Sequence, residues 1–206
     1  MEATATTREK IIYHALKLFA AKGYDGVSMR EIAAAVGIQG ASLYNHFNGK
    51  EDIFNAIFTE MTKQYDAAAT MLQVPIEAAA PAAEQYHNIS EEQLFEAGKG
   101  LFSFFTQNEF AVLFRKLLVS EQHKFPLAGE RFQQYYLDGP IQFQSAVFSA
   151  LQQTGDLVEC DAETMALHFY SPIYYLLSKF DLGCPYDDCL MQLEKHVHLF
   201  CTLYRK

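Results

Sequence analysis

Residues 28–50 read SMREIAAAVGIQGASLYNHFNGK, and this stretch decides the fold. Ser28, followed three residues later by Glu31, forms the capping-box pattern that begins a helix. Apolar residues then recur at the spacing i, i+3, i+4 and i+7, at Met29, Ile32, Ala33 and Val36. Gly37 is typical of a helix that ends in the left-handed conformation. The pattern predicts a short helix with one buried face, followed by a glycine turn.

A second short helix is expected directly after this turn. Leu43 and Phe47 are spaced i and i+4, so both would lie on its buried face. The other face carries uncharged donors and acceptors, which suit contacts with phosphates and base edges: Gln39, Ser42, Tyr44, Asn45 and His46. Two short helices joined by a glycine turn indicate a helix-turn-helix, a common DNA-binding motif.

The stretch resembles the DNA-binding domain of the TetR family of bacterial transcriptional regulators. The family pattern T-x-R-x-I-A-x-x-x-G-V-S-x-G-T-L-Y-x-H-F-x-S-K-E reads here as Ser28, Arg30, Ile32, Ala33, Gly37, Ile38, Gln39, Ala41, Ser42, Leu43, Tyr44, His46, Phe47, Gly49, Lys50 and Glu51. The preceding residues match as well, including the Gly23, Tyr24 and Ser28 link, and the resemblance covers roughly the first 60 residues. It implies a TetR-like regulator, with later residues matching only in length and helical character.

This chain departs from the family pattern at two positions of the second helix. Gln39 stands where the family usually has Ser or Thr, and Ala41 stands where Gly is common. Both positions lie at the DNA-facing start of the recognition helix. They therefore affect which base sequence is read rather than whether DNA is bound.

The resemblance and the side-chain chemistry together predict a set of DNA-contacting residues. The groove floor is assigned to Gln39, Gly40, Ala41 and Asn45, since amide side chains pair with adenine and an alanine methyl contacts a thymine methyl. The phosphate contacts are assigned to Ser28, Arg30, Ser42, Tyr44, His46 and Lys50.

Three of these assignments have structural alternatives. Ser28 can act only as a helix cap, although capping is compatible with a phosphate contact. Tyr44 can pack against the protein, and Arg30 can pair with Asp25 or Glu31.

The charge of the chain is unevenly distributed. The net charge of −9 over 206 residues at first argues against a nucleic-acid partner. Residues 1–50, however, carry six basic and four acidic side chains, which leaves ten basic against 21 acidic in the rest. A mildly basic head on an acidic remainder fits a DNA-binding protein whose acidic part is repelled by the duplex.

Composition indicates a cytoplasmic protein without a membrane span. No run approaches the roughly 20 apolar residues of a transmembrane helix, and the first residues lack a signal pattern. The four cysteines, at 160, 184, 189 and 201, contain no CxxC motif and are expected to be reduced.

The remaining periodicity predicts an all-α protein of about nine helices. The expected division is a helix-turn-helix domain over residues 1–50, a connecting helix over 51–71 and an effector-binding and dimerisation domain over 72–206. Residues 74–89 contain Pro75 and Pro81 and are expected to be a loop or a broken helix. A helix is expected from Pro126 to Gly155, broken or kinked at Gly139-Pro140.

One recognition helix reads only a few base pairs, so the resemblance also implies a homodimer on a palindromic double-stranded operator. The last helix has the 3-4-3-4 apolar spacing of a helix-bundle seam. The predicted interface comprises Phe169, Ile173, Leu177, Leu190, Leu193, Val197, Phe200 and Tyr204. The alternative is that this seam is an internal core, because two heptads are short.

The middle of the chain is rich in aromatic residues, which favours a small-molecule pocket with a few polar anchors. The candidate residues are Phe102, Phe105, Phe114, Arg115, His123, Tyr136, Phe143, His168, Tyr170 and Tyr174. Pro172 is expected to kink its helix beside Tyr170 and Tyr174. Each polar candidate has surface or satisfied-core placement as its alternative.

Metal and enzyme chemistry are not expected. Glu194, His198 and Cys201 share a helix face, but His196 points elsewhere and a zinc site needs more ligands. No catalytic motif is present. The sequence therefore predicts a cofactor-free, homodimeric repressor that a small molecule releases from its operator; the alternative is a TetR-fold adaptor that acts through a protein partner.

Overall fold

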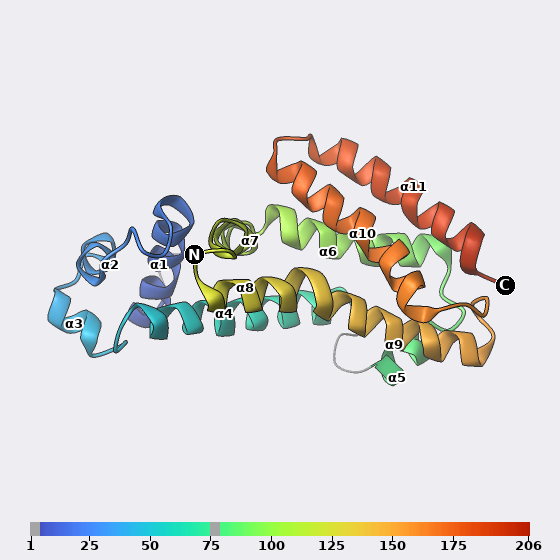
Figure 1. Ribbon diagram of the computed structural model, residues 1–206, viewed down its shortest axis with the longest axis horizontal. Coiled ribbons are helices and arrows are strands. Elements are labelled where there is room, and N and C mark those ends of the chain that lie inside the picture. Colours follow the sequence, from blue (N-terminus) through green and yellow to red (C-terminus); the bar gives the residue numbers. More distant parts are fainter. Residues whose placement is uncertain (1–4, 75–78) are drawn as a thin grey trace. The chain divides into compact units, whose positions relative to one another are not determined.

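The computed structural model describes residues 5–74 and 79–206. Over these ranges the chain forms eleven α-helices, one π-helical turn and no β-strand beyond a single bridge between Leu157 and Arg205. The all-α fold expected from the sequence is confirmed (Figure 1). The helices are α1 (Thr7–Lys22), α2 (Met29–Val36), α3 (Gly40–Tyr44), α4 (Lys50–Met71), α5 (Ala79–Tyr86), α6 (Glu91–Gln107), α7 (Glu109–Glu121), α8 (Pro126–Phe132), η1 (Gln133–Leu137), α9 (Asp138–Thr154), α10 (Ala162–Asp181) and α11 (Tyr186–Tyr204).

Side-chain caps set several of these helix starts. Reciprocal capping boxes begin α1, α2 and α6, at Thr6 with Glu9, Ser28 with Glu31 and Ser90 with Gln93. Asp161 caps α10 by accepting from the Thr164 N–H at 2.7 Å. These interactions satisfy the first unpaired N–H groups of each helix, so the helix starts are fixed by local sequence.

The chain packs as two compact units. The first contains residues up to Tyr65 together with Glu109–Phe132, and the second contains Asp66–Asn108 and Gln133–Lys206. In the first unit α7 packs along α1, and Phe114 of α7 meets Phe58 of α4 at 5.1 Å between ring centroids. The predicted division into residues 1–50, 51–71 and 72–206 concerns the functions of the segments, and it stays a prediction.

The second unit has two groups of buried apolar residues. One lies among α5, α9, α10 and α11 and includes Val147, Met165 and Phe200. The other joins α6, α10 and α11 through Phe102 and Leu193. Helices α10 and α11 form a hairpin and run side by side (Figure 1).

Residues 79–86 form helix α5, although the sequence favoured a loop or broken helix around Pro75 and Pro81. Pro81 is the third residue of α5, where its missing N–H leaves no intrahelical bond unmade. Ala82 and Ala83 are buried, so packing stabilises a helix that periodicity does not reveal. Pro75 lies outside the described residues.

The helix expected from Pro126 to Gly155 is interrupted before Gly139-Pro140 rather than at it. The π-helical turn η1 separates α8 from α9, and α9 begins at Asp138. Pro140 has no N–H to donate to the carbonyl of Tyr136, four residues earlier, and the Tyr170 hydroxyl donates to that oxygen at 3.2 Å. A Cβ on Gly139 would lie 2.0 Å from the Gln134 carbonyl oxygen, so the widened turn requires glycine there.

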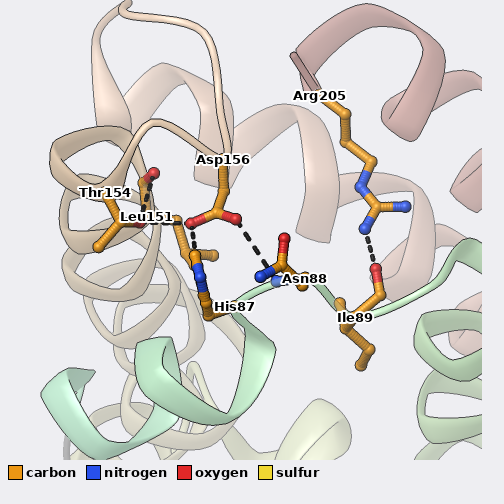
Figure 2. Close-up of polar contacts among 7 residues, drawn as sticks. All are labelled: His87, Asn88, Ile89, Leu151, Thr154, Asp156 and Arg205. Atoms are coloured by element: carbon orange, nitrogen blue, oxygen red, sulfur yellow. Dashed lines mark hydrogen bonds and ion pairs between the residues drawn. The ribbon is translucent and has the colours of Figure 1, made fainter.

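Asp156 links the α5–α6 connection to the end of α9 (Figure 2). Its carboxylate accepts from His87 Nδ1 at 2.8 Å, from the Asn88 N–H at 3.4 Å and from the Thr154 hydroxyl. Arg205, near the end of the chain, donates to the Ile89 carbonyl oxygen. Burial acts to raise the pKa of Asp156, but the hydrogen bonds from Thr154, His87 and Asn88 outweigh it and lower the pKa below the ordinary value of 3.8.

Within the described ranges, no helix has both the length and the apolar character needed to cross a membrane.

The glycine requirement of the π-helical turn can be tested by substitution. We expect Gly139→Ala to reduce the free energy of unfolding by about 1–3 kcal/mol, because the new Cβ overlaps a backbone carbonyl. Gly98→Ala is a matched control, since a Cβ at Gly98 in α6 meets nothing within 4 Å. That control should gain about 0.5–1 kcal/mol from helix propensity. Thermal unfolding measures both, and equal melting temperatures for the two variants would contradict the assignment.

The Asp156 contacts should be visible in the pH dependence of stability. Because the folded-state pKa is lowered, the carboxylate stabilises the fold above the pKa of the unfolded chain, and this stabilisation is lost as the pH falls through the folded-state pKa. We expect Asp156→Asn to lower stability by about 1–2 kcal/mol at pH 7. The difference from wild type should shrink below about pH 4. Urea unfolding at several pH values measures it; a difference independent of pH would argue against an ionic role.

Candidate nucleic-acid interface

A buried scaffold fixes the geometry of the helix-turn-helix. Ile32 of α2 and Leu43 of α3 are fully buried, and Phe47 is 1% exposed. Gly37 adopts the left-handed conformation, with φ 78° and ψ 29°, and its N–H bonds to carbonyls of the last turn of α2. The Ile38 N–H also returns to the Ala33 carbonyl oxygen at 3.0 Å. The turn between α2 and α3 is therefore defined by backbone hydrogen bonds as well as by packing.

The opposite side of α3 faces solvent. Tyr44 is 58% exposed, although it is large and mostly apolar. Gln39 precedes α3 without making a side-chain cap hydrogen bond, so its amide remains available for another contact. Helix α3 ends at Tyr44 rather than at Phe47, and Asn45 and His46 follow it in a turn. The residues predicted to face the DNA are exposed, apart from half-buried Ser42: Gln39, Gly40, Ala41, Ser42, Tyr44, Asn45 and His46.

Ion pairing at the start of α2 leaves Arg30 available. The Glu31 carboxylate accepts from Lys22 Nζ at 2.8 Å and from the Ser28 N–H and hydroxyl at 2.9 Å each. These contacts, Lys22 first, lower the pKa of Glu31 to about 2. Arg30 is exposed and makes no ion pair with a described residue, so neither Asp25 nor Glu31 holds it. Ser28 caps α2, which was the structural alternative to a phosphate contact and is compatible with one.

Lys50 is held in place by the link between α1 and α2. Its Nζ donates to the Tyr24 carbonyl oxygen at 2.9 Å and lies 4.5 Å from the centroid of the Tyr24 ring. It also lines an open depression of about 390 Å³ together with Asp25, Gly26, Val27, Ser28, Met29 and Glu31. Since one N–H is used internally, two remain for another acceptor.

The residues predicted to line an effector pocket fall into both units. Phe114, Arg115 and His123 belong to the first unit, where Phe114 and Arg115 are buried and His123 is exposed. The other candidates lie in the second unit: Phe102, Phe105, Tyr136, Phe143, His168, Tyr170 and Tyr174.

Four of these seven residues gather beside the π-helical turn. The Tyr136 ring lies 6.1 Å from Phe105 and 6.5 Å from Tyr174, and Tyr170 donates to its carbonyl oxygen. Phe102 and Phe143 instead contribute to the two core groups of the second unit. His168 is exposed and bonds to the Tyr204 hydroxyl. Among the predicted pocket residues, Phe105, Tyr136, Tyr170 and Tyr174 therefore lie together beside the π-helical turn.

The apolar seam of α11 faces the interior of its own chain. Leu177, Leu193, Val197 and Phe200 are each at most 5% exposed, in the core groups shared with α6, α9 and α10. Phe169, Ile173, Leu190 and Tyr204 are half-buried beside them. The fully buried residues of the seam therefore pack within their own chain, as the alternative interpretation held, and coverage of the half-buried residues by a second copy stays a prediction.

The apolar side chains that the α10–α11 hairpin exposes are not those of the predicted interface, and sequence analysis did not identify them. They are Leu167, Tyr175, Leu182, Met191, Leu199 and Leu203, which are 45–90% exposed. Spacings of eight and four residues place Met191, Leu199 and Leu203 on one side of α11, and Leu167 and Tyr175 share a side of α10. Their signal in the sequence is weak, because charged and polar residues separate them.

The histidines and cysteines near the C-terminus do not gather into a metal site. His196 Nε2 contacts the Phe169 carbonyl oxygen at 2.7 Å, and His198 pairs with Glu91 at 2.8 Å. Among the described residues no three His, Cys, Asp or Glu side chains are placed to share a metal ion. All four cysteines are free thiols.

Comparison with known proteins supports the helix-turn-helix assignment. Residues 11–57 match the family model of the bacterial regulatory proteins of the tetR family. Over 47 residues the chain is 47% identical to IcaR of Staphylococcus epidermidis, the HTH-type negative transcriptional regulator of the biofilm operon icaADBC. The aligned region is 23% of this chain and 25% of IcaR, so the chain spans about a quarter of the length of the curated relatives it matches.

Solved structures match over nearly the whole chain. A putative TetR-family transcriptional regulator from Mesorhizobium loti covers 100% of both chains, with a TM-score of 0.70 and 20% identity. SmeT, the repressor of the Stenotrophomonas maltophilia multidrug efflux pump SmeDEF, covers 98% of this chain and 92% of its own, with a TM-score of 0.68 and 16% identity. These likenesses establish the fold of the whole chain, and the match over residues 11–57 establishes its head. Residues 11–57 therefore form a tetR-family helix-turn-helix region, within a chain that has the fold of these regulators.

Proposed function

We propose that this protein is a homodimeric transcriptional repressor that binds a palindromic operator and is released from it by a small molecule. The observation that carries the proposal is the exposed, uncharged face of α3 on a buried helix-turn-helix scaffold. The protein acts on double-stranded DNA in the cytoplasm, and it needs no cofactor or membrane.

In the proposed complex, the start of α3 enters the major groove. Gln39 and Asn45 have amides that pair bidentately with adenine, and Gly40 and Ala41 allow close approach to the base edges. Ser28, Arg30, Ser42, Tyr44, His46 and Lys50 contact the phosphates on either side. The exposure of Gln39, Arg30 and Tyr44 supports this assignment. Lys50 supports it as well, because two of its three ammonium N–H groups remain to donate to a phosphate.

We assign the dimer interface to the exposed apolar residues of the α10–α11 hairpin. Leu199 and Leu203 are 56% and 58% exposed, and Met191 is 48% exposed on the same side of α11. A second copy of this hairpin would bury these side chains in an isologous interface. Two heads are then available for two half-sites, which lie one helical turn of DNA apart, about 34 Å.

The proposed effector site is the aromatic group around Tyr136. Aromatic walls with hydroxyl groups suit a planar organic molecule, and π-helical turns frequently occur at functional sites. Release is a population shift toward a dimer whose heads do not fit successive major grooves. A 100-fold fall in operator occupancy requires the effector to prefer the released state by ~2.7 kcal/mol.

The first experiment is selection of genomic DNA fragments by the purified protein, followed by footprinting of the best fragment. A palindromic site protected over two half-sites supports the proposal. Absence of enrichment at physiological salt would favour an adaptor that acts through a protein partner.

The phosphate and base assignments predict different mutant behaviour. Tyr44→Ala combined with Lys50→Ala should weaken binding to every duplex and lower the salt dependence of the affinity, by about 0.9 in slope for each lost phosphate contact. Gln39→Ala should instead cost about 1–3 kcal/mol at one base pair and relax specificity there. Fluorescence anisotropy over a salt series measures both effects. Lys63→Ala, which removes a lysine of α4 whose side chain is 70% exposed, is the control; unchanged affinity in the double variant would refute the phosphate assignments.

The interface assignment predicts the oligomeric state of charged variants. Leu199→Glu with Leu203→Glu should convert the dimer to monomers at micromolar concentration, because carboxylates would be buried without partners. Met71→Glu is a matched control, since Met71 is 85% exposed on α4 and outside the assigned interface. Sedimentation velocity measures the mass. A dimer that persists in the double variant would move the interface elsewhere.

A further inference from the structure

The corner between α7 and α8, residues 122–125, packs against the link between α1 and α2. Phe125 lies in this corner, where its N–H bonds to the Glu121 carbonyl oxygen at 3.0 Å. Its ring stacks on Tyr24, with 4.3 Å between centroids and 10° between planes. Phe54 of α4 meets both rings edge-on, at 5.4 Å from Tyr24 and 5.0 Å from Phe125. The plane of the Tyr24 ring is thus fixed by a residue about 100 positions away in the sequence.

The Tyr24 residue in turn holds Lys50. The Lys50 ammonium is 4.5 Å from the Tyr24 ring centroid and donates to the Tyr24 carbonyl oxygen. A lysine side chain has four rotatable bonds, and ordering such a side chain on binding costs about 0.5–1.5 kcal/mol. Contacts with both the ring and the carbonyl of one residue reduce that cost, because the ammonium is already placed before DNA arrives.

A second contact, between Glu121 and Gly23, joins the end of α7 to the link between α1 and α2. Glu121 is 2% exposed, and a Cβ on Gly23 would lie 3.0 Å from its Oε1 atom. Gly23 has φ of 78°, in the left-handed region that favours glycine. Lys124 of the corner donates to the Glu121 carboxylate at 3.2 Å. The end of α7 and the corner after it therefore contact two consecutive residues, Gly23 and Tyr24, rather than the Tyr24 ring alone.

We propose that Phe125 is a positioning residue for DNA binding: through the Tyr24 ring it holds the Lys50 ammonium where a phosphate is bound. This inference rests on the proposed phosphate contact of Lys50. It gives residues 109–132, which the sequence placed in the effector-binding domain, a supporting role behind the DNA-binding surface. Phe125 itself does not touch DNA.

A double-mutant cycle separates positioning from a structural role. The variants are Phe125→Leu, Lys50→Ala and their combination, in the full-length protein. The probe is a duplex of about 30 base pairs of arbitrary sequence, because phosphate contacts do not depend on base identity. We expect Phe125→Leu to weaken binding about 2- to 10-fold per chain in the wild-type background. In the Lys50→Ala background it should have no further effect, since the residue it positions is gone.

Two further variants serve as controls. Phe110→Leu makes the same change at a residue of α7 that is 5% exposed in the same unit. Any loss of affinity that it causes should be equal in the two backgrounds. Phe125→Tyr retains the stacked ring plane and should restore affinity to within about twofold of wild type.

Each outcome decides the inference. If Lys50→Ala weakens binding but Phe125→Leu does not, or weakens it equally in both backgrounds, Phe125 has no positioning role and the proposed function stands. If Lys50→Ala leaves affinity unchanged while the wild type binds, the phosphate assignment and the inference both fail. If the wild type does not bind the duplex even at low salt, the DNA-binding proposal itself is refuted.

Discussion

The burial of Leu43 and Phe47, together with that of Ile32, determines which side of α3 faces solvent. All three side chains are nearly inaccessible, so α3 has only one orientation in which its apolar side is covered. That orientation turns Gln39, Tyr44 and Asn45 toward solvent. The turn at Gly37 adds directional constraint, because its left-handed backbone places the start of α3 without a side-chain clash. The polar character of the exposed side of α3 is therefore a consequence of what its other side buries.

The same head is completed by a distant part of the chain. Helix α7 is held along α1 by the Tyr13 hydroxyl, which donates to Glu109 at 2.7 Å, and by Lys17, which pairs with Glu109 at 3.6 Å. At the other end of α7, Glu121 and Phe125 reach Gly23 and Tyr24. Exposed ion pairs of this kind contribute little energy, so the aromatic and apolar contacts must provide most of the stabilisation. A movement of α7 is thereby coupled physically to the link that precedes α2.

The local features of the fold were predictable from the sequence, and the non-local ones were not. Capping boxes depend on residues three positions apart, so Ser28 with Glu31 and Ser90 with Gln93 could be identified directly. The seam of α11 shows the limit of periodicity: spacing identifies an apolar side at Leu193 and Val197, but not whether the same chain or a second copy covers it. The stack of Phe125 on Tyr24 had no sequence signal, because stacking leaves no pattern across 100 residues.

The basic residues of the head are largely engaged within the protein. Lys22 pairs with Glu31, the Arg8 guanidinium lies 4.7 Å from the Phe47 ring centroid, and Lys50 donates to the Tyr24 carbonyl oxygen. These contacts order the side chains and reduce the free positive charge available for non-specific attraction to DNA. The exposed face of α3 itself carries no Asp, Glu, Lys or Arg side chain. In the proposed complex, discrimination among sequences would then depend mainly on the amides of Gln39 and Asn45, while Arg30 and a pre-positioned Lys50 would provide a small number of defined phosphate contacts.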